Sequence, residues 1–178
     1  TASNLATNMN KIHLVGLGLL GGSFALAAKQ KFPELYISGQ DLNPQHLQDA
    51  LDLGIITVAK SIPDGDTDLV ILATPADTLG DLLVQTLGQI GAETLVFDLG
   101  STKSKLCSLV AEHPKRSQYL AAHPIAGTEY SGPKAANAEL LDRKVMILCE
   151  MEKTDLHLKE KAYRFFDALN LKLRFMDP

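Results

Sequence analysis

The sequence contains no tryptophan, only two cysteines and no excess of positive charge. Aromatic residues make up 6% of the chain, so we expect the core to be built from Leu, Ile, Val and Ala. Two cysteines, Cys107 and Cys149, are too few for a disulfide framework and fit a reducing, cytoplasmic compartment. The 17 Lys and Arg against 21 Asp and Glu argue against a nucleic-acid partner, which needs a basic surface to contact phosphates.

The sequence also lacks an apolar run suited to a membrane. The most apolar stretch, 12–28, contains His13, Ser23 and several glycines, whereas a membrane helix needs about 20 apolar residues with few helix breakers. Ala25 to Ala27 resembles a signal-peptidase site, but the polar segment before it has only Lys11 as a charge. We therefore expect neither a signal peptide nor a membrane partner, and predict a buried strand followed by a helix.

What the chain does contain is a regular alternation of short aliphatic runs and helical patterns. Continuous apolar runs such as 69–73 are typical of strands that are covered on both faces. The predicted strands are 12–15, 35–39, 69–73, 94–98, 119–122, 144–149 and 172–175, with room for a short extra strand near 55–58. The predicted helices are 21–31, 44–53, 77–90, 102–112 and 154–169.

This alternation predicts an α/β fold with a Rossmann-like, doubly wound and largely parallel sheet. No repeat, low-complexity tract or linker divides the chain. We expect residues 1–10 to be a polar tail and residues 11–178 to form one dinucleotide-binding domain. Because the last predicted strand ends three residues before Pro178, we expect the chain to be truncated before a further domain.

The segment Gly16-Leu17-Gly18-Leu19-Leu20-Gly21 matches G-x-G-x-x-G between a predicted strand and a predicted helix. In this context the first glycine permits a tight turn, the second lets the backbone approach a pyrophosphate, and the third allows close helix packing. Backbone amides at the helix N-terminus then face the phosphates. We predict cofactor contacts at Gly16, Gly18, Leu19, Leu20 and Gly21. The alternative is that these glycines merely form a turn.

Asp41 lies at the end of the second predicted strand, twenty positions after Gly21. An acid at this place can accept hydrogen bonds from a ribose 2′-hydroxyl. No Arg follows in 42–44, so a 2′-phosphate would meet a carboxylate with no cation beside it, and the segment favours NAD over NADP. The alternative is that Asp41 caps the helix starting near Pro44. A P-loop is excluded because the phosphate-binding Lys is missing.

Polar residues also follow two later strands, Ser101 after one and His123 after the next. Ligands bind outside the carboxyl ends of parallel strands, so both are expected near the nicotinamide end of a dinucleotide. A neutral imidazole is suited to take the hydroxyl proton during hydride transfer, and a serine could orient it or bind the same oxygen. The alternatives are a helix N-cap for Ser101 and a hydrogen-bonded loop residue for His123.

The remaining candidates for chemistry are few. The other histidines, which fall in predicted strands or helices and look structural, are His13, His46, His113 and His157. No group of His, Cys, Asp and Glu has metal-ligand spacing, so no metal is predicted, and no G-x-S-x-G motif supports a hydrolase.

Three segments together, 15–23, 98–103 and 123–132, resemble the prephenate and arogenate dehydrogenase family of tyrosine biosynthesis. Segment 69–75 also fits the family pattern, and the resemblance covers essentially 11–178. It implies NAD-dependent oxidative decarboxylation of prephenate to 4-hydroxyphenylpyruvate, or of arogenate to tyrosine.

The resemblance also implies roles for individual residues. The family's catalytic histidine falls on His123, which would accept a hydrogen bond from the ring C4 hydroxyl or deprotonate it. Its serine falls on Ser101, near both that histidine and the nicotinamide. The other implied contacts are with the cofactor at Thr74 and Pro75 and with the substrate at Thr128 and Glu129.

The family continues after the position of 176–178 into an all-helical domain, which supplies dimer contacts, a further histidine and the arginine that holds the substrate carboxylate. That domain is absent here, so we expect this chain to bind NAD but to turn over poorly, and the full-length protein to be a homodimeric enzyme. Two other hypotheses stay open: a Rossmann reductase that acts on a β-hydroxyacid or imine, and a non-catalytic NAD-sensing module.

Overall fold

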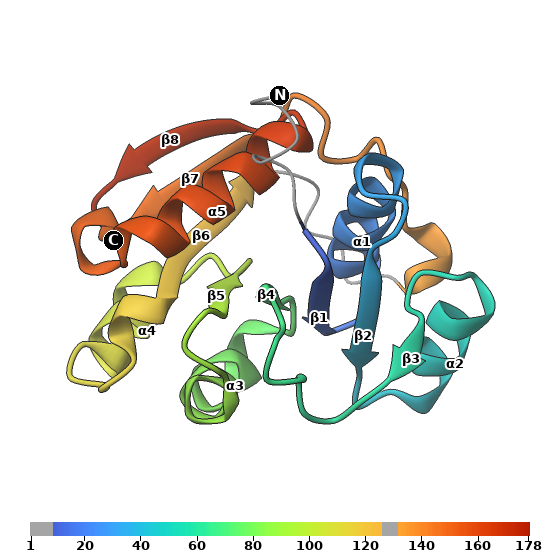
Figure 1. Cartoon of the computed structure of the whole chain (residues 1–178), viewed down its shortest axis with the longest axis horizontal. Coiled ribbons are helices and arrows are strands. Elements are labelled where there is room, and N and C mark those ends of the chain that lie inside the picture. The colour runs from blue at the N-terminus through green and yellow to red at the C-terminus, as the bar shows by residue number, and fades with distance from the viewer. Residues whose placement is uncertain (1–8, 126–131) are drawn as a thin grey trace.

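The computed structural model of the chain describes residues 9–125 and 132–178 (Figure 1). Its strands are β1 (Lys11–Val15), β2 (Tyr36–Gln40), β3 (Val58–Ala59), β4 (Leu69–Leu72), β5 (Leu95–Asp98), β6 (Tyr119–Ile125), β7 (Val145–Cys149) and β8 (Lys172–Met176). Its α-helices are α1 (Leu19–Lys31), α2 (Pro44–Asp52), α3 (Ala76–Gln89), α4 (Lys103–Val110) and α5 (Leu156–Ala168). Short 3-10 helices are η2 (Arg116–Gln118), η3 (Pro133–Ala135) and η4 (Met151–Lys153). The predicted elements are confirmed, with small shifts at their ends.

The strands form one sheet in the order β3-β2-β1-β4-β5-β6-β7-β8. Neighbours from β3 to β6 are parallel, β7 runs antiparallel to β6, and β8 runs parallel to β7. The first six strands thus have the 3-2-1-4-5-6 order of a doubly wound dinucleotide-binding sheet. The predicted Rossmann-like, largely parallel fold is confirmed. The antiparallel pairing of β6 with β7 could not be predicted from the sequences of these strands.

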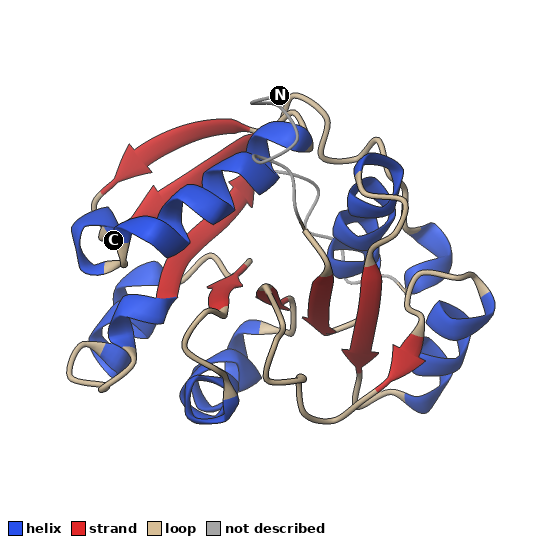
Figure 2. Cartoon of the chain, viewed as in Figure 1, coloured by secondary structure: helices blue, strands red, loops and turns tan. Residues whose placement is uncertain are grey.

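Helices cover both faces of this sheet, as Figure 2 shows. Side chains of α1, α2 and α5 belong to one buried cluster, whereas those of α3 and α4 belong to a second cluster on the opposite face. Covering both faces explains why every residue of β4 and β5 is buried. No helix of the described segments is long and apolar enough to cross a membrane, and the apolar stretch 12–28 forms β1 and α1.

The few aromatic side chains are concentrated in the larger cluster. The ring centroid of Phe97 on β5 lies 6.0 Å from that of Phe24, 6.2 Å from that of Phe165 and 5.1 Å from that of Phe166. All four rings are buried. The expectation of a core of Leu, Ile, Val and Ala therefore holds for most of the interior but misses this aromatic centre. Composition counts residues and does not say where the chain brings them together.

Candidate functional site

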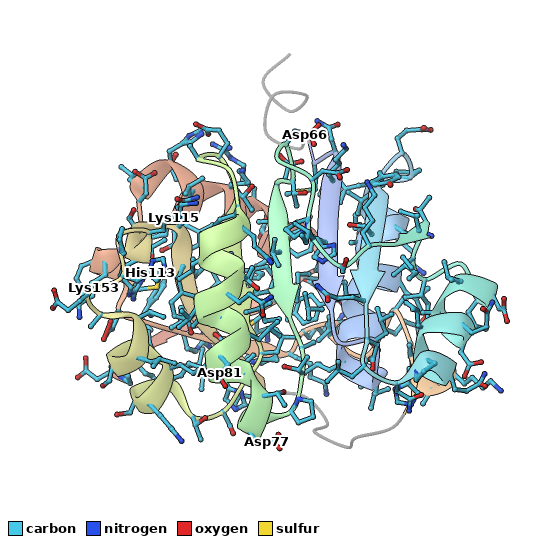
Figure 3. All side chains as sticks on the ribbon, turned by 90° about the horizontal axis from the view of Figure 1, so that it is seen from below. Asp66, Asp77, Asp81, His113, Lys115 and Lys153 are labelled. Atoms are coloured by element: carbon cyan, nitrogen blue, oxygen red, sulfur yellow. The ribbon has the colours of Figure 1, made fainter. Side chains whose placement is uncertain are left out.

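The predicted site residues were expected at the carboxyl edge of the parallel strands. Asp66 precedes β4 and Asp77 lies in the first turn of α3, after β4, and Figure 3 shows these two side chains at opposite ends of the molecule. Since β1, β2, β4, β5 and β6 run the same way, the segments that follow them gather at the Asp77 end. This is the edge where ligands bind in open α/β sheets.

The turn between β1 and α1 needs glycine at two positions. Gly16 has a φ of +96°, and a Cβ there would lie 2.6 Å from the carbonyl oxygen of Ala73. A Cβ at Gly21 would lie 2.3 Å from the carbonyl oxygen of Gly16. At Gly16 the turn packs against the end of β4, and at Gly21 the start of α1 packs against the turn. Neither position has room for a side chain.

The N-terminus of α1 has no side-chain cap. Gly18 is the N-cap residue, no side chain accepts a hydrogen bond from the first turn, and that turn contains no acidic residue. In contrast, the N-cap of α2 is Asn43, whose side chain accepts hydrogen bonds from that helix's own amides. The first amides of α1 thus carry the helix dipole's partial positive charge, and no side chain of the described residues caps them. This end of α1 is suited to a pyrophosphate.

Asp41 connects the two loops that follow β1 and β2. Its Oδ2 accepts a hydrogen bond of 2.7 Å from the backbone amide of Leu17, and its Oδ1 accepts one of 2.8 Å from that of Asn43. The helix cap of α2 is Asn43, so the alternative that Asp41 caps this helix is wrong. Each carboxylate oxygen has a further lone pair with which it can accept a hydrogen bond from a ribose hydroxyl.

Ser101 lies exposed in the loop between β5 and α4. The N-cap residue of α4 is Thr102, and no side chain caps this helix. The alternative that Ser101 is a helix cap is therefore wrong. Its hydroxyl does not serve α4 and can serve a ligand.

His123 lies inside β6, which runs on to Ile125 rather than ending at Ala122 as predicted. The residue pairs with Ile147 on β7, so it is not in a loop. Its Nδ1 is buried and has no hydrogen-bond partner in the described part of the chain. Leaving a buried polar atom unpaired costs about 1–3 kcal/mol.

Ser101 and His123 line the same pocket, which has a volume of about 530 Å³. This volume lies within the range of small-molecule sites, roughly 300–1,000 Å³. One wall comes from the start of α4 and the other from β6, β7 and the end of β8. The structure thus brings together the two residues that were predicted to do the chemistry.

The family described as "prephenate dehydrogenase, nucleotide-binding domain" matches residues 24–174. The chain belongs to the prephenate dehydrogenase family. It is 36% identical over 174 residues to prephenate dehydrogenase from Bacillus subtilis, across 94% of this chain and 46% of that protein. It is 31% identical over 147 residues to cyclohexadienyl dehydrogenase from Zymomonas mobilis, across 80% of this chain and 50% of that protein. The resemblance found in the sequence is confirmed.

Solved structures of the prephenate dehydrogenase family have the same fold. The structure of A. aeolicus prephenate dehydrogenase in complex with hydroxyphenyl propionate and NAD+ superimposes with a TM-score of 0.88 at 30% identity. The match covers 97% of this chain and 62% of that chain. This chain spans about half the length of the curated family members described above.

Two charged residues beside the pocket were missed by sequence reasoning. Asp98, the last residue of β5, is fully buried, and its carboxylate accepts a hydrogen bond from the ammonium of Lys103 at the start of α4. Tyr119 donates a hydrogen bond of 2.7 Å to the same carboxylate. Burial, together with this negative charge, raises the pKa of Tyr119 well above its usual value, so the phenol stays a donor. The sequence did contain a signal for Asp98, because this charged residue directly follows the apolar residues 95–97 of the same strand.

The remaining predicted contacts are Thr74 and Pro75 for the cofactor and Thr128 and Glu129 for the substrate. Thr74 follows β4, and its Oγ1 is buried without a hydrogen-bond partner in the described residues. Pro75 is the N-cap residue of α3, which also lacks a side-chain cap. Both lie beside the glycine turn, so a cofactor contact stays a prediction for each. Thr128 and Glu129 lie outside the described residues.

Two other histidines show a different environment. His13 is buried on β1, with its Nδ1 2.7 Å from Ser38 Oγ and its Nε2 3.1 Å from Gln40 Nε2. Burial lowers the pKa of His13 to about 4. It is a structural residue, as predicted. His46, also predicted to be structural, places its Nδ1 3.9 Å from Asp41 Oδ2, at the expected ribose site.

Proposed function

We propose that the whole protein containing this chain is an NAD-dependent prephenate dehydrogenase, and that residues 11–178 form its cofactor-binding domain with the catalytic histidine. The observation that carries this proposal is the shared pocket of Ser101 and His123, at the sheet edge where the glycine turn leaves α1 uncapped. Membership of the family supports it, as does the A. aeolicus relative's complex with NAD+.

The residues present fit a dinucleotide. Gly16 and Gly21 have no Cβ, so the turn can pack closely against β4 and α1. The uncapped amides from Gly18 to Leu20 would hold the pyrophosphate. Asp41 would accept hydrogen bonds from the adenosine ribose, and Thr74, whose Oγ1 has no partner among the described residues, offers a further contact. When bound, NAD+ accepts the hydride from the ring carbon that carries the hydroxyl.

His123 would receive the proton of the C4 hydroxyl as the hydride leaves C4, so that a ring carbonyl forms. Ser101 would hydrogen-bond the same oxygen or orient the imidazole. The electrons of the bond to the ring carboxylate then move through the ring to the carbonyl oxygen, which takes back a proton, while CO₂ leaves and the ring becomes aromatic. Aromatisation drives this last step, so the protein need not supply a decarboxylating group.

The remaining assignments of the proposal concern the rest of the protein. Thr128 and Glu129 are proposed to line the substrate pocket, and the whole protein is proposed to be a homodimer. A cytoplasmic location is supported by Cys107 and Cys149, which are buried free thiols. Burial raises the pKa of Cys107 to about 11, so this thiol is unreactive.

The test measures NADH formation from prephenate and from arogenate by the full-length protein, with identification of the aromatic product. We expect turnover of at least one of these substrates. His123→Asn should lower kcat by about a hundredfold or more, the contribution typical of a general base. His113→Asn is the control, because His113 lies beyond α4 and does not line the pocket.

Each contrary result has its own meaning. An undiminished rate in His123→Asn would remove this residue from the mechanism. Activity on 3-hydroxy acids but not on prephenate or arogenate would identify another Rossmann reductase. NAD binding without turnover of any of these substrates would identify a non-catalytic NAD-binding module.

A further inference from the structure

The ladder between β5 and β6 ends before the strands do. Its last pair is Phe97 with Leu120, and beyond it the two strands separate. Past that point a side chain replaces the backbone acceptor, because Asp98 Oδ1 accepts a hydrogen bond of 3.3 Å from the amide of Ala122. The opening between the strand ends is therefore bridged by the carboxylate of Asp98.

The same carboxylate also reaches the following loop. Asp98 Oδ2 accepts a hydrogen bond of 3.1 Å from the amide of Gly100. Gly100 directly precedes Ser101, and Ala122 directly precedes His123. One buried side chain thus holds the backbone one residue before each residue proposed to act on the substrate. This arrangement needs a close approach, because a Cβ at Gly100 would lie 3.2 Å from Asp98 Oδ2 and 2.5 Å from Leu79 Cδ2.

The carboxylate is held by donors on both oxygens. In addition to the two amides, Asp98 Oδ1 accepts the 2.7 Å hydrogen bond from Tyr119, and Oδ2 accepts from the Lys103 ammonium. A buried carboxylate is unfavourable unless it is paired and hydrogen-bonded, and Asp98 meets both conditions. With four donors around it the group has little freedom to rotate.

We infer that Asp98 is a positioning residue that sets the spacing of Ser101 and His123, with Lys103 as its counter-ion. The inference rests on the proposed function, since it assigns this spacing a catalytic purpose. Reacting groups displaced by about 1 Å can lose a hundredfold in rate, so a rigid tether between them has a direct kinetic effect. Asp98 itself does not line the pocket.

The kinetic test compares two variants of the full-length protein. Asp98→Asn keeps the shape, but an NH₂ group, which cannot accept hydrogen bonds, replaces one carboxylate oxygen, so one of the two backbone contacts is lost. We expect kcat to fall by about tenfold to a hundredfold, with the KM for prephenate and the Kd for NAD little changed. The control is Thr94→Val, which removes a buried 2.6 Å hydrogen bond to the Thr67 carbonyl oxygen, just before β5 begins.

The structural test uses hydrogen exchange at single amides and does not depend on activity. In the parent protein the amides of Gly100 and Ala122 should be protected. Asp98→Asn should lose this protection at one or both amides, and Thr94→Val should keep it.

The outcomes separate the inference from the proposed function. If the parent protein oxidises neither prephenate nor arogenate, the proposed function fails, and exchange alone decides whether Asp98 tethers the two segments. If kcat of Asp98→Asn stays within about twofold of the parent value, or falls no further than that of Thr94→Val, the positioning role is wrong. Unchanged exchange at both amides also overturns it. If Asp98→Asn does not fold, the double variant with Lys103→Met, which leaves neither charge buried alone, takes its place.

Discussion

The carboxylate of Asp41 accepts a hydrogen bond of 2.7 Å from the backbone amide of Leu17. The residue predicted to select the cofactor therefore also anchors the turn predicted to bind its phosphates. Its second oxygen holds the amide of Asn43, the N-cap residue of α2. A change at Asp41 should accordingly alter both the choice of cofactor and the strength with which any dinucleotide binds.

Asp41→Asn should weaken NAD binding by about tenfold, the loss expected for a charge-assisted hydrogen bond worth about 1.5 kcal/mol. NADP binding should weaken less, because the carboxylate no longer repels a 2′-phosphate. Fluorescence titrations with NADH and NADPH measure both affinities. Asp49→Asn is the control, since Asp49 lies on α2 and its carboxylate accepts a hydrogen bond from the side chain of Gln45. Tighter NADP than NAD binding by the parent protein would contradict the prediction.

Gly21→Ala should abolish measurable dinucleotide binding and destabilise the fold. The new Cβ would lie 2.3 Å from the carbonyl oxygen of Gly16, so the turn has to move. Gly88→Ala is the matched control. Gly88 lies in α3, and a Cβ at this position would have no neighbouring atom of the described residues within 4 Å. This variant should stabilise the protein by up to about 1 kcal/mol. Calorimetric NAD titration and thermal unfolding test both variants, and normal NAD binding by Gly21→Ala would refute the role of this turn.

Ser101→Ala should reduce kcat while leaving the free energy of unfolding unchanged within about 0.5 kcal/mol, as for surface positions. The reason is that Ser101 does not cap α4. Losing its hydrogen bond to the reacting oxygen should cost at least about tenfold in kcat. Asn43→Ala, which removes a true cap, should instead cost about 1 kcal/mol of stability. A fall in the stability of Ser101→Ala to match Asn43→Ala would show a structural role.

His13 should make the protein less stable in mild acid. Gln40 Nε2 donates to His13 Nε2, so the neutral ring carries its proton on Nδ1 and donates it to Ser38. Burial lowers the pKa of His13 from 6.5 to about 4 in the folded state, so between these values the unfolded chain binds the extra proton. The contribution of neutral His13 to the free energy of unfolding should be fully present above pH 6.5 and should fall by about 3 kcal/mol as the pH is lowered to 4.

Urea unfolding at a series of pH values measures this dependence on His13. The variant His13→Gln cannot titrate and should lose the part of the slope between pH 4 and 6.5 that His13 contributes. Equal slopes for the two proteins across this interval would show that His13 is not the responsible group.

Features of the candidate site that are formed by consecutive residues could be predicted from the sequence, whereas features that depend on distant segments could not. The G-x-G-x-x-G turn, with Asp41 twenty positions later, is readable because strand, turn and helix are consecutive in the chain. His123 and Ser101 were placed at the right edge because parallel strands end together. The end of β6 was predicted at Ala122, whereas pairing with β7, a segment far along the chain, continues the strand to Ile125.

The sequence by itself determined the alternation of strands and helices, the glycine turn and the edge of the sheet that carries the site, since each depends on neighbouring residues or on periodicity. Only the tertiary structure decided that β7 runs antiparallel, that Phe97 meets Phe24 and two rings of α5, and that Asp98 ties Gly100 to Ala122. These features join segments that are far apart in the chain, so their free energy comes from side-chain packing and from the hydrogen bonds that offset the burial of a charge. No local pattern records which distant partner a residue will meet.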